Sequence, residues 1–124
     1  MSFNGARILH VEDEVLIALE VESICLENGA STVRHISDLD DISDGELGAF
    51  DLAVVDLSVR GRSTLPLAEM IAQHGIPMVF MSGLDRTAVA DRFPTALFIE
   101  KPFKAGDVIE AISKALAAQR SRGI

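Results

Sequence analysis

Short apolar runs alternate with amphipathic stretches along the whole chain. The apolar runs are short and rich in β-branched residues, as buried strands are. They predict strands near residues 6–11, 31–35, 51–56, 77–82 and 96–100. The intervening stretches repeat apolar positions with helical spacing and predict helices near 14–28, 38–47, 64–74, 84–92 and 105–119. Gly29 and Gly75 stand where two helices should end, and Pro66 suits a first helical turn.

Five strand-helix units in succession predict an α/β fold. Strands joined through helices pair in parallel, and helices cover both faces of such a sheet. Right-handed crossovers then favour a doubly wound (βα)5 parallel sheet with the flavodoxin-like strand order 2-1-3-4-5. In this order, the carboxyl ends of the first and third strands border the crevice that binds ligands. The chain of 124 residues has room for one domain, spanning 1–124.

The first predicted helix carries two apolar stripes where a surface helix needs only one. The stripes lie on opposite sides of the helix. The first consists of Ile17, Val21 and Ile24, and the second consists of Val15, Leu19 and Leu26. One interpretation is a single broad apolar face that is wholly buried. The other is that the second stripe is an exposed surface for a partner or for a second copy in a homodimer.

Composition excludes several classes of protein. The formal net charge of −8 argues against nucleic-acid binding, because neutralising phosphates requires clustered Lys and Arg. No apolar run approaches the roughly 18 residues of a membrane span, and residues 1–7 contain no apolar signal core. Cys25 is the single cysteine and has no partner for an internal disulfide. We therefore expect a cytoplasmic protein without a membrane partner.

Acidic side chains gather where the first and third strands should end. Glu12 and Asp13 follow the first strand, and Asp56 closes the third. Crowded carboxylates repel one another unless a cation neutralises them, and Mg²⁺ prefers such oxygen ligands. We expect Asp13 and Asp56 to bind Mg²⁺ directly, Glu12 to reach it directly or through water, and the backbone carbonyl of Ser58 to complete the protein ligands. Taken singly, Asp13 could merely cap a helix and Asp56 could merely begin a loop.

Two further strand ends supply the other groups that phosphoryl transfer needs. Asp56 can act as a nucleophile that forms an aspartyl phosphate. The Ser82 hydroxyl and the Lys101 ammonium can each bind one phosphoryl oxygen. Pro102 permits a cis bond that could aim Lys101 back across the sheet. The alternative is an ordinary turn at Ser82 and a solvated surface charge at Lys101.

Four tetrapeptides in order, each at the end of a predicted strand, make the chain resemble the receiver domain of two-component response regulators. They are Val11-Glu12-Asp13-Glu14, Val54-Val55-Asp56-Leu57, Phe80-Met81-Ser82-Gly83 and Glu100-Lys101-Pro102-Phe103. The resemblance covers essentially the whole chain and implies a stand-alone receiver with no output domain. The stretch 75–83 is also similar to a subgroup of stand-alone alphaproteobacterial receivers that carry a Phe-Ala-Thr-Gly motif there.

The resemblance implies a role for each site residue. Asp56 would be the phosphoacceptor, Glu12 and Asp13 the acid pair for Mg²⁺, Ser82 the switch hydroxyl and Lys101 the phosphate-contacting lysine. Phe98 falls where the family keeps its rotating aromatic. The chain departs from the family after the phosphoacceptor, where 57–63 replaces the usual Met-Pro and Asp-Gly signature, and only 19 positions separate Ser82 from Lys101.

The function implied is a response regulator that takes a phosphoryl group from a sensor histidine kinase or a histidine phosphotransfer protein. It would catalyse only its own phosphorylation and dephosphorylation, and it would signal by binding a downstream protein. The alternative is a phosphorelay intermediate or phosphate sink. A metal-dependent phosphatase fits less well, because Asp56-Leu57-Ser58 lacks the second carboxylate, two positions on, that aspartate-nucleophile phosphatases use. His10, His35 and His74 lack ligand spacing and are interpreted as structural or surface residues.

Overall fold

The chain folds around a five-stranded parallel sheet. The structure is a computed structural model that describes residues 3–83 and 87–122. The strand order is β2-β1-β3-β6-β7, which corresponds to the predicted order 2-1-3-4-5 and confirms the flavodoxin-like fold. The sheet strands are β1 (Arg7–Val11), β2 (Thr32–Ile36), β3 (Leu52–Asp56), β6 (Met78–Ser82) and β7 (Leu97–Glu100). Each lies within one residue of its predicted position.

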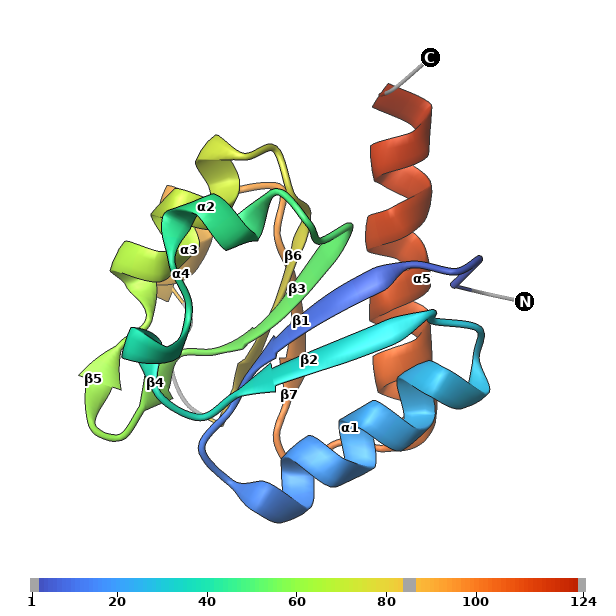
Figure 1. Ribbon diagram of the computed structural model, residues 1–124, viewed down its shortest axis with the longest axis horizontal. Helices are drawn as coiled ribbons and strands as arrows, with labels where there is room; N and C mark the ends of the chain where they lie inside the picture. Colours follow the sequence, from blue (N-terminus) through green and yellow to red (C-terminus); the bar gives the residue numbers. More distant parts are fainter. Residues whose placement is uncertain (1–2, 84–86, 123–124) are drawn as a thin grey trace.

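Helices cover both faces of the sheet, as the strand-helix alternation predicts. The helices are α1 (Val15–Glu27), α2 (Asp44–Leu47), α3 (Leu65–Gln73), α4 (Thr87–Arg92) and α5 (Ala105–Arg122). Figure 1 shows α1 and α5 on one side of the sheet and α2, α3 and α4 on the other. Among the described residues, no helix combines the length and the apolar character needed to cross a membrane.

The alternating side chains of the strands divide the core into two layers. In β1, Ile8 packs with the layer under α1 and α5, whereas Leu9 packs with the layer under α2, α3 and α4. Both side chains are fully or almost fully buried. The period of two in a strand sends neighbouring residues to opposite faces, and a parallel sheet buries both of them. This rigid centre places the carboxyl ends of β1 and β3 side by side.

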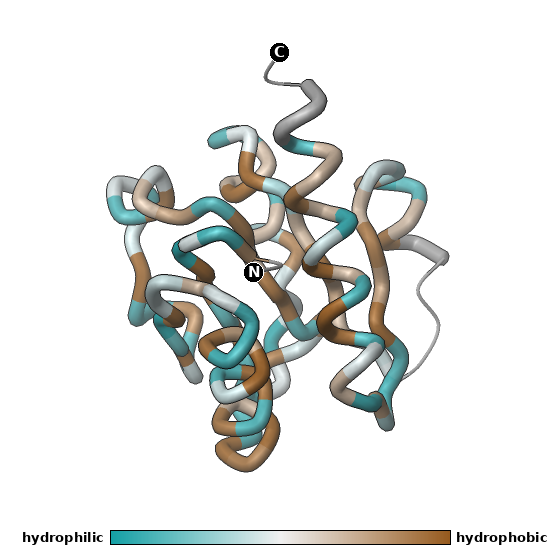
Figure 2. Tube along the Cα trace, turned by 90° about the vertical axis from the view of Figure 1, so that its right-hand side faces the viewer, coloured by the Kyte–Doolittle hydropathy of each residue, from teal (hydrophilic) through white to brown (hydrophobic). Residues whose placement is uncertain are grey.

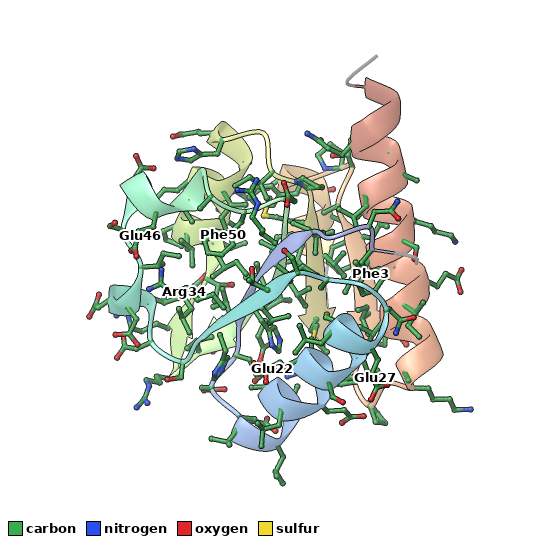
Figure 3. All side chains as sticks on the ribbon, turned by 45° about the vertical axis from the view of Figure 1, so that its right-hand side comes forward. Phe3, Glu22, Glu27, Arg34, Glu46 and Phe50 are labelled. Carbon is green, nitrogen blue, oxygen red and sulfur yellow. The ribbon has the colours of Figure 1, made fainter. Side chains whose placement is uncertain are left out.

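The second predicted helix forms differently from the prediction. Instead of one helix over 38–47, the chain makes a 3₁₀ turn, η1 (Leu39–Asp41), followed by the single-turn α2. The Asp38 carboxylate accepts a hydrogen bond from the Asp40 amide, and Ser43 forms a capping box with Glu46. Short polar side chains that bond to nearby backbone start new turns rather than extend a helix. Figure 3 labels Arg34 and Glu46, whose ion pair joins β2 to α2.

The ends of the other helices follow the predicted signals. Gly29 (φ 99°) and Gly75 (φ 72°) adopt the left-handed conformation just after α1 and α3, and Pro66 lies in the first turn of α3. The predicted fourth helix, 84–92, begins at Thr87 in the structure, and the expected residues 84–86 lie outside the described part of the chain.

The outer face of α1 carries an exposed apolar patch. The patch consists of Val15 (65% exposed), Leu16 (81%), Leu19 (58%) and Leu26 (45%). The stripe predicted at Val15, Leu19 and Leu26 is therefore exposed, and the interpretation that it is buried is wrong. Leu16, the most exposed of the four, adds to the patch and was not predicted. In Figure 2, α1 is the lowest helix of the view and has strongly hydrophobic residues on its outermost turns.

The inner face of α1 packs on the sheet as a normal amphipathic helix does. Val21, Ile24 and Cys25 are buried there together with Phe3, labelled in Figure 3 near the start of β1. Burial raises the pKa of the Cys25 thiol to about 12, which keeps it protonated and unreactive at neutral pH. Cys25 therefore packs as a small hydrophobic residue in the core.

Candidate functional site

Three carboxylates meet at the carboxyl edge of the sheet. Glu12 and Asp13 follow β1, Asp56 ends β3, and β1 and β3 are parallel neighbours. Each residue offers an oxygen, and the three oxygens lie within 4.8 Å of one another. A set of hard carboxylate oxygens suits a hard divalent cation such as Mg²⁺ better than a softer metal that prefers nitrogen or sulfur. The predicted acid cluster is therefore formed, and it could hold a metal ion.

Lys101 reaches this cluster from the end of β7. Its Nζ lies 2.9 Å from Asp56 Oδ2 and 3.3 Å from Glu12 Oε1, so it donates a hydrogen bond to each carboxylate. The Lys101–Pro102 peptide bond is cis, as the sequence suggested. The alternative interpretation of Lys101 as a solvated surface charge is wrong, because only 20% of its side chain is exposed.

Burial and charge set the protonation of this pair. The Glu12 side chain is fully buried, and this burial, with the nearby charge of Asp56, raises the pKa of its carboxyl from 4.5 to about 7. Burial alone would lower the pKa of Lys101, but its hydrogen bond to Asp56 and the charges of Asp56 and Glu12 raise it overall. Lys101 is thus a permanent cation beside a carboxyl group that titrates near neutral pH.

The metal-free protein should lose stability as the pH rises from about 4.5 to about 7. In this window Glu12 keeps its proton in the folded state but has lost it in the unfolded chain. Stability falls with pH wherever the folded state binds more protons. The shift corresponds to at most about 3 kcal/mol in the free energy of unfolding. Urea unfolding in EDTA at several pH values measures the free energy of unfolding. Glu12→Gln should make this free energy depend less steeply on pH. An equally steep dependence in the variant would contradict the raised pKa of Glu12.

The backbone and one buried hydroxyl position Asp56. The Leu57 amide donates to Asp56 Oδ1 at 2.8 Å, which leaves Oδ2 facing Lys101. The hydroxyl of Thr64, which is fully buried, donates to the Asp56 backbone carbonyl at 2.6 Å. The Thr64 amide also donates to the Leu57 carbonyl. Thr64 was not predicted from the sequence, because a Thr just before a helix is usually a simple N-cap.

The segment after Asp56, where the chain departs from the family signature, forms a small hairpin. Its strands β4 (Ser58–Val59) and β5 (Arg62–Ser63) are antiparallel and are joined by Arg60 and Gly61. The Arg60 amide donates to Asp13 Oδ2 at 2.8 Å. Ser58, whose carbonyl is a predicted metal ligand, is the first residue of this hairpin, and that role remains a prediction.

Ser82 and Phe98 lie next to the site on the two adjoining strands. Ser82 ends β6, is almost completely buried, and its backbone carbonyl accepts a hydrogen bond from the Lys101 amide at 2.9 Å. Phe98 is half-buried in β7 and stacks on Phe80, with ring centroids 5.7 Å apart. The switch role of both residues remains a prediction.

One histidine is closer to the site than the sequence analysis expected. His35 Nε2 lies 2.6 Å from the Glu12 carbonyl oxygen. A carbonyl can only accept, so this nitrogen carries the proton. His10 is fully buried, and desolvation lowers its pKa to about 3, so it is neutral; within the described part of the chain, neither of its ring nitrogens has a hydrogen-bond partner. His74 pairs with Asp44 at the surface, as interpreted.

Comparison with solved structures gives matches over nearly the whole chain, whereas no family model and no curated protein matches the sequence. NtrX from Brucella abortus in complex with ATP is 34% identical with a TM-score of 0.82 over 96% of this chain, which spans only 28% of the NtrX chain. A response regulator receiver protein from Sinorhizobium medicae is 25% identical with a TM-score of 0.76, covering 93% of this chain and 97% of its own.

A response regulator receiver domain protein from Clostridium thermocellum is 19% identical, and at that level the likeness shows the fold alone. It has a TM-score of 0.80 and covers 94% of this chain and 98% of its own. The five-stranded parallel sheet of this chain agrees with the fold of these matches. The structural neighbours of this chain are thus receiver domains of response regulators, which confirms the resemblance.

Proposed function

We propose that this receiver accepts a phosphoryl group on Asp56 from a phosphohistidine of a histidine kinase or phosphotransfer protein, with Mg²⁺ bound, and signals through changed protein binding. The observation that supports it most is the contact of Lys101 Nζ with Asp56 Oδ2, beside the cluster of Glu12 and Asp13. This arrangement combines a nucleophile, a cation site and a fixed positive charge within a few ångströms. Phosphoryl transfer depends mainly on such positioning and charge neutralisation.

In the proposed reaction a carboxylate oxygen of Asp56 attacks the phosphorus of the donor. The new O–P bond forms as the P–N bond of the phosphohistidine breaks, and the imidazole nitrogen keeps the bonding electron pair. The Leu57 amide and Lys101 hold Asp56 in place before the reaction. Lys101 and the Ser82 hydroxyl would then bind oxygens of the phosphoryl group.

Mg²⁺ would be held by Glu12, Asp13, Asp56 and the backbone carbonyl of Ser58. When bound, it neutralises charge on the phosphoryl oxygens. The donor set supports this choice, because all four ligands are oxygens and Glu12 needs a nearby cation to stay ionised at neutral pH. In the metal-free protein, the positive charge of Lys101 partly stabilises the ionised form of Glu12.

A small acyl phosphate with Mg²⁺ is expected to add one phosphoryl group to the protein. Acetyl phosphate needs no kinase and therefore tests the site alone. Intact-mass spectrometry is the suitable readout, since the chain has no Trp or Tyr for intrinsic fluorescence. EDTA should prevent the mass gain. A protein that binds Mg²⁺ but is never phosphorylated would contradict the proposal.

Phosphorylation would act on the rest of the molecule through Ser82 and Phe98. Movement of Ser82 toward the phosphoryl group would make room for Phe98 to rotate inward and shift an existing equilibrium. Phe98 stacks on the buried Phe80. This contact supports a switch role for Phe98, because it connects the edge of the site to the hydrophobic core. Nuclear magnetic resonance with beryllofluoride, a stable phosphoryl mimic, would map the surface that responds.

A phosphorelay intermediate or phosphate sink is the second candidate, and it would use the same chemistry. The two functions differ in what the phosphorylated protein does next. A relay returns its phosphoryl group to a histidine donor, whereas a binding module gains affinity for a protein that is not a kinase. Turnover of a phosphomonoester substrate would instead indicate a phosphatase.

The exposed patch on α1, formed by Val15, Leu16, Leu19 and Leu26, suits a protein interface. It begins directly after the acid cluster, so a partner bound there would lie beside Asp56. Figure 3 labels Glu22 and Glu27, two of the acidic residues of α1, a helix without Lys or Arg. Self-association would bring like charges together, so a partner with basic residues fits this patch better than the predicted homodimer.

Replacing Leu19 and Leu26 together by Glu should weaken binding of the kinase or phosphotransfer protein at least tenfold. Both side chains are exposed, so the fold and the reaction with acetyl phosphate should be unaffected. Affinity measurements and analytical ultracentrifugation separate a partner interface from a homodimer. If partner affinity and oligomeric state both stay as in the wild type, the patch is not an interface.

A further inference from the structure

We infer that the β4–β5 hairpin is a positioning device for Asp13: its tip holds the Asp13 carboxylate, through the Arg60 amide, in the orientation that binds the metal ion. This inference rests on the proposed Mg²⁺ site at Glu12, Asp13 and Asp56. It goes further by assigning a role to a segment that differs from the family signature. In Figure 1 the hairpin stands beside η1 at the carboxyl edge of the sheet.

The turn itself is built to present this amide. Arg60 and Gly61 have φ values of 52° and 76°, so both adopt the left-handed conformation of a tight two-residue hairpin turn. A positive φ is unfavourable for Arg, which has a Cβ, and such strain persists only where the surroundings impose it. The benefit here is the hydrogen bond from the Arg60 amide to Asp13 Oδ2 at 2.8 Å.

The base of the hairpin is fixed to the phosphoacceptor strand. Val59 is fully buried, and the Thr64 hydroxyl and amide bond to the backbone carbonyls of Asp56 and Leu57. The hairpin follows Asp56 in the chain and is hydrogen-bonded to its backbone, so its position is fixed relative to Asp56. The tip of the hairpin contacts Asp13, which follows the neighbouring strand β1. It fixes two of the three acids of the cluster relative to each other.

Charged side chains hold the tip from its other side. Arg60 Nε donates to the Ser37 carbonyl at 2.9 Å. Arg62 lies 3.5 Å from Asp40 and 3.9 Å from Asp38, and Arg60 lies 3.9 Å from Asp38. These ion pairs are more than one-third exposed and are individually weak, so we assign the positioning to the amide and only support to the guanidinium groups.

Orientation of Asp13 matters because one carboxylate oxygen is occupied by the amide. The second oxygen would then face the cation site and lose less side-chain entropy when the ion binds. Partners that orient a metal ligand typically change affinity by about 10- to 100-fold when they are removed. We therefore expect a change at the lower end of this range, because a backbone turn can relax.

Two turn variants separate the amide from the side chain. Gly61→Val makes the positive φ unfavourable, and an added Cβ would meet no atom within 4 Å, so the fold should be retained. We expect its Mg²⁺ dissociation constant to rise about tenfold. Arg60→Gly keeps the amide and favours a positive φ, so its affinity should stay within about twofold of the wild type. Equal affinity in wild type and Gly61→Val would overturn the inference.

Two further measurements show whether the effect passes through Asp13. In an Asp13→Ala background, Gly61→Val should change Mg²⁺ affinity less than about twofold, because the group it orients is gone. In the metal-free wild type, hydrogen exchange of the Arg60 amide should be slow and should accelerate at least tenfold in Asp13→Ala. An Arg60 amide insensitive to Asp13 would overturn the inference, whereas failure of the wild type to bind Mg²⁺ would overturn the proposed function.

Discussion

Asp56→Asn should abolish phosphorylation by acetyl phosphate and Mg²⁺ while leaving the fold intact. An amide oxygen is a far weaker nucleophile than a carboxylate, so no acyl phosphate can form at this position. The Asn side chain has nearly the same shape and can still accept from the Leu57 amide, which contacts Asp56 Oδ1. The expected result is no mass gain where the wild type gains one phosphoryl group. Circular dichroism would verify the fold.

The matched control is Asp51→Asn, at the other end of the same stretch. Asp51 precedes β3 and pairs with Arg7, far along the strand from the acid cluster. Its pair is more than one-third exposed, so the change should cost little stability and leave phosphorylation unchanged. Full labelling of Asp56→Asn, or loss of labelling in Asp51→Asn, would place the nucleophile elsewhere.

Lys101→Met should have opposite effects on metal binding and on phosphoryl transfer. The ammonium lies within 3.3 Å of both Glu12 and Asp56, so it competes with a divalent cation for the same carboxylates. Removing one positive charge at this distance should strengthen Mg²⁺ binding by about tenfold, which corresponds to about 1.4 kcal/mol of relieved repulsion. The rate of phosphorylation should fall at least 100-fold, because a preorganised cation for the phosphoryl oxygens is lost.

Opposite changes in Mg²⁺ affinity and in phosphorylation rate would show that the charge of Lys101 acts in phosphoryl transfer and does not merely hold the acids in place. Lys104→Met is the matched control, since Lys104 is exposed and lies three residues away. Lys104→Met should change neither the Mg²⁺ affinity nor the phosphorylation rate by more than about twofold. A parallel fall of Mg²⁺ affinity and phosphorylation rate in Lys101→Met would mean that Lys101 organises the acids and does not compete with the metal ion.

The sheet and the meeting of the acids could be predicted because they follow from local patterns and one topological rule. Apolar runs located all five sheet strands, and parallel order required the ends of β1 and β3 to be neighbours. Glu12, Asp13 and Asp56 then had to converge, although 43 positions separate Asp13 from Asp56. Lys101 was predicted for the same reason, since every strand end of a parallel sheet opens onto one edge.

What could not be predicted depends on contacts between segments that have no pattern of their own. The hydrogen bonds of Thr64 and of the Arg60 amide arise only when a two-residue turn forms. Arg at a positive φ gives no sequence signal, because Gly, Asn and Asp are the residues expected there. The division of 38–47 into η1 and α2 was missed because local caps at Asp38 and Ser43 outweighed helical spacing.

Locating the phosphoryl group on the chain decides whether Asp56 is the phosphoacceptor. Borohydride converts an aspartyl phosphate to homoserine, and tandem mass spectrometry of tryptic peptides then identifies the residue. We expect homoserine at position 56, in the peptide spanning 35–60, and none in the peptide spanning 8–34 that contains Glu12 and Asp13. Reduction at any other carboxylate, or an unreduced Asp56 in protein that carries the phosphoryl mass, would contradict it.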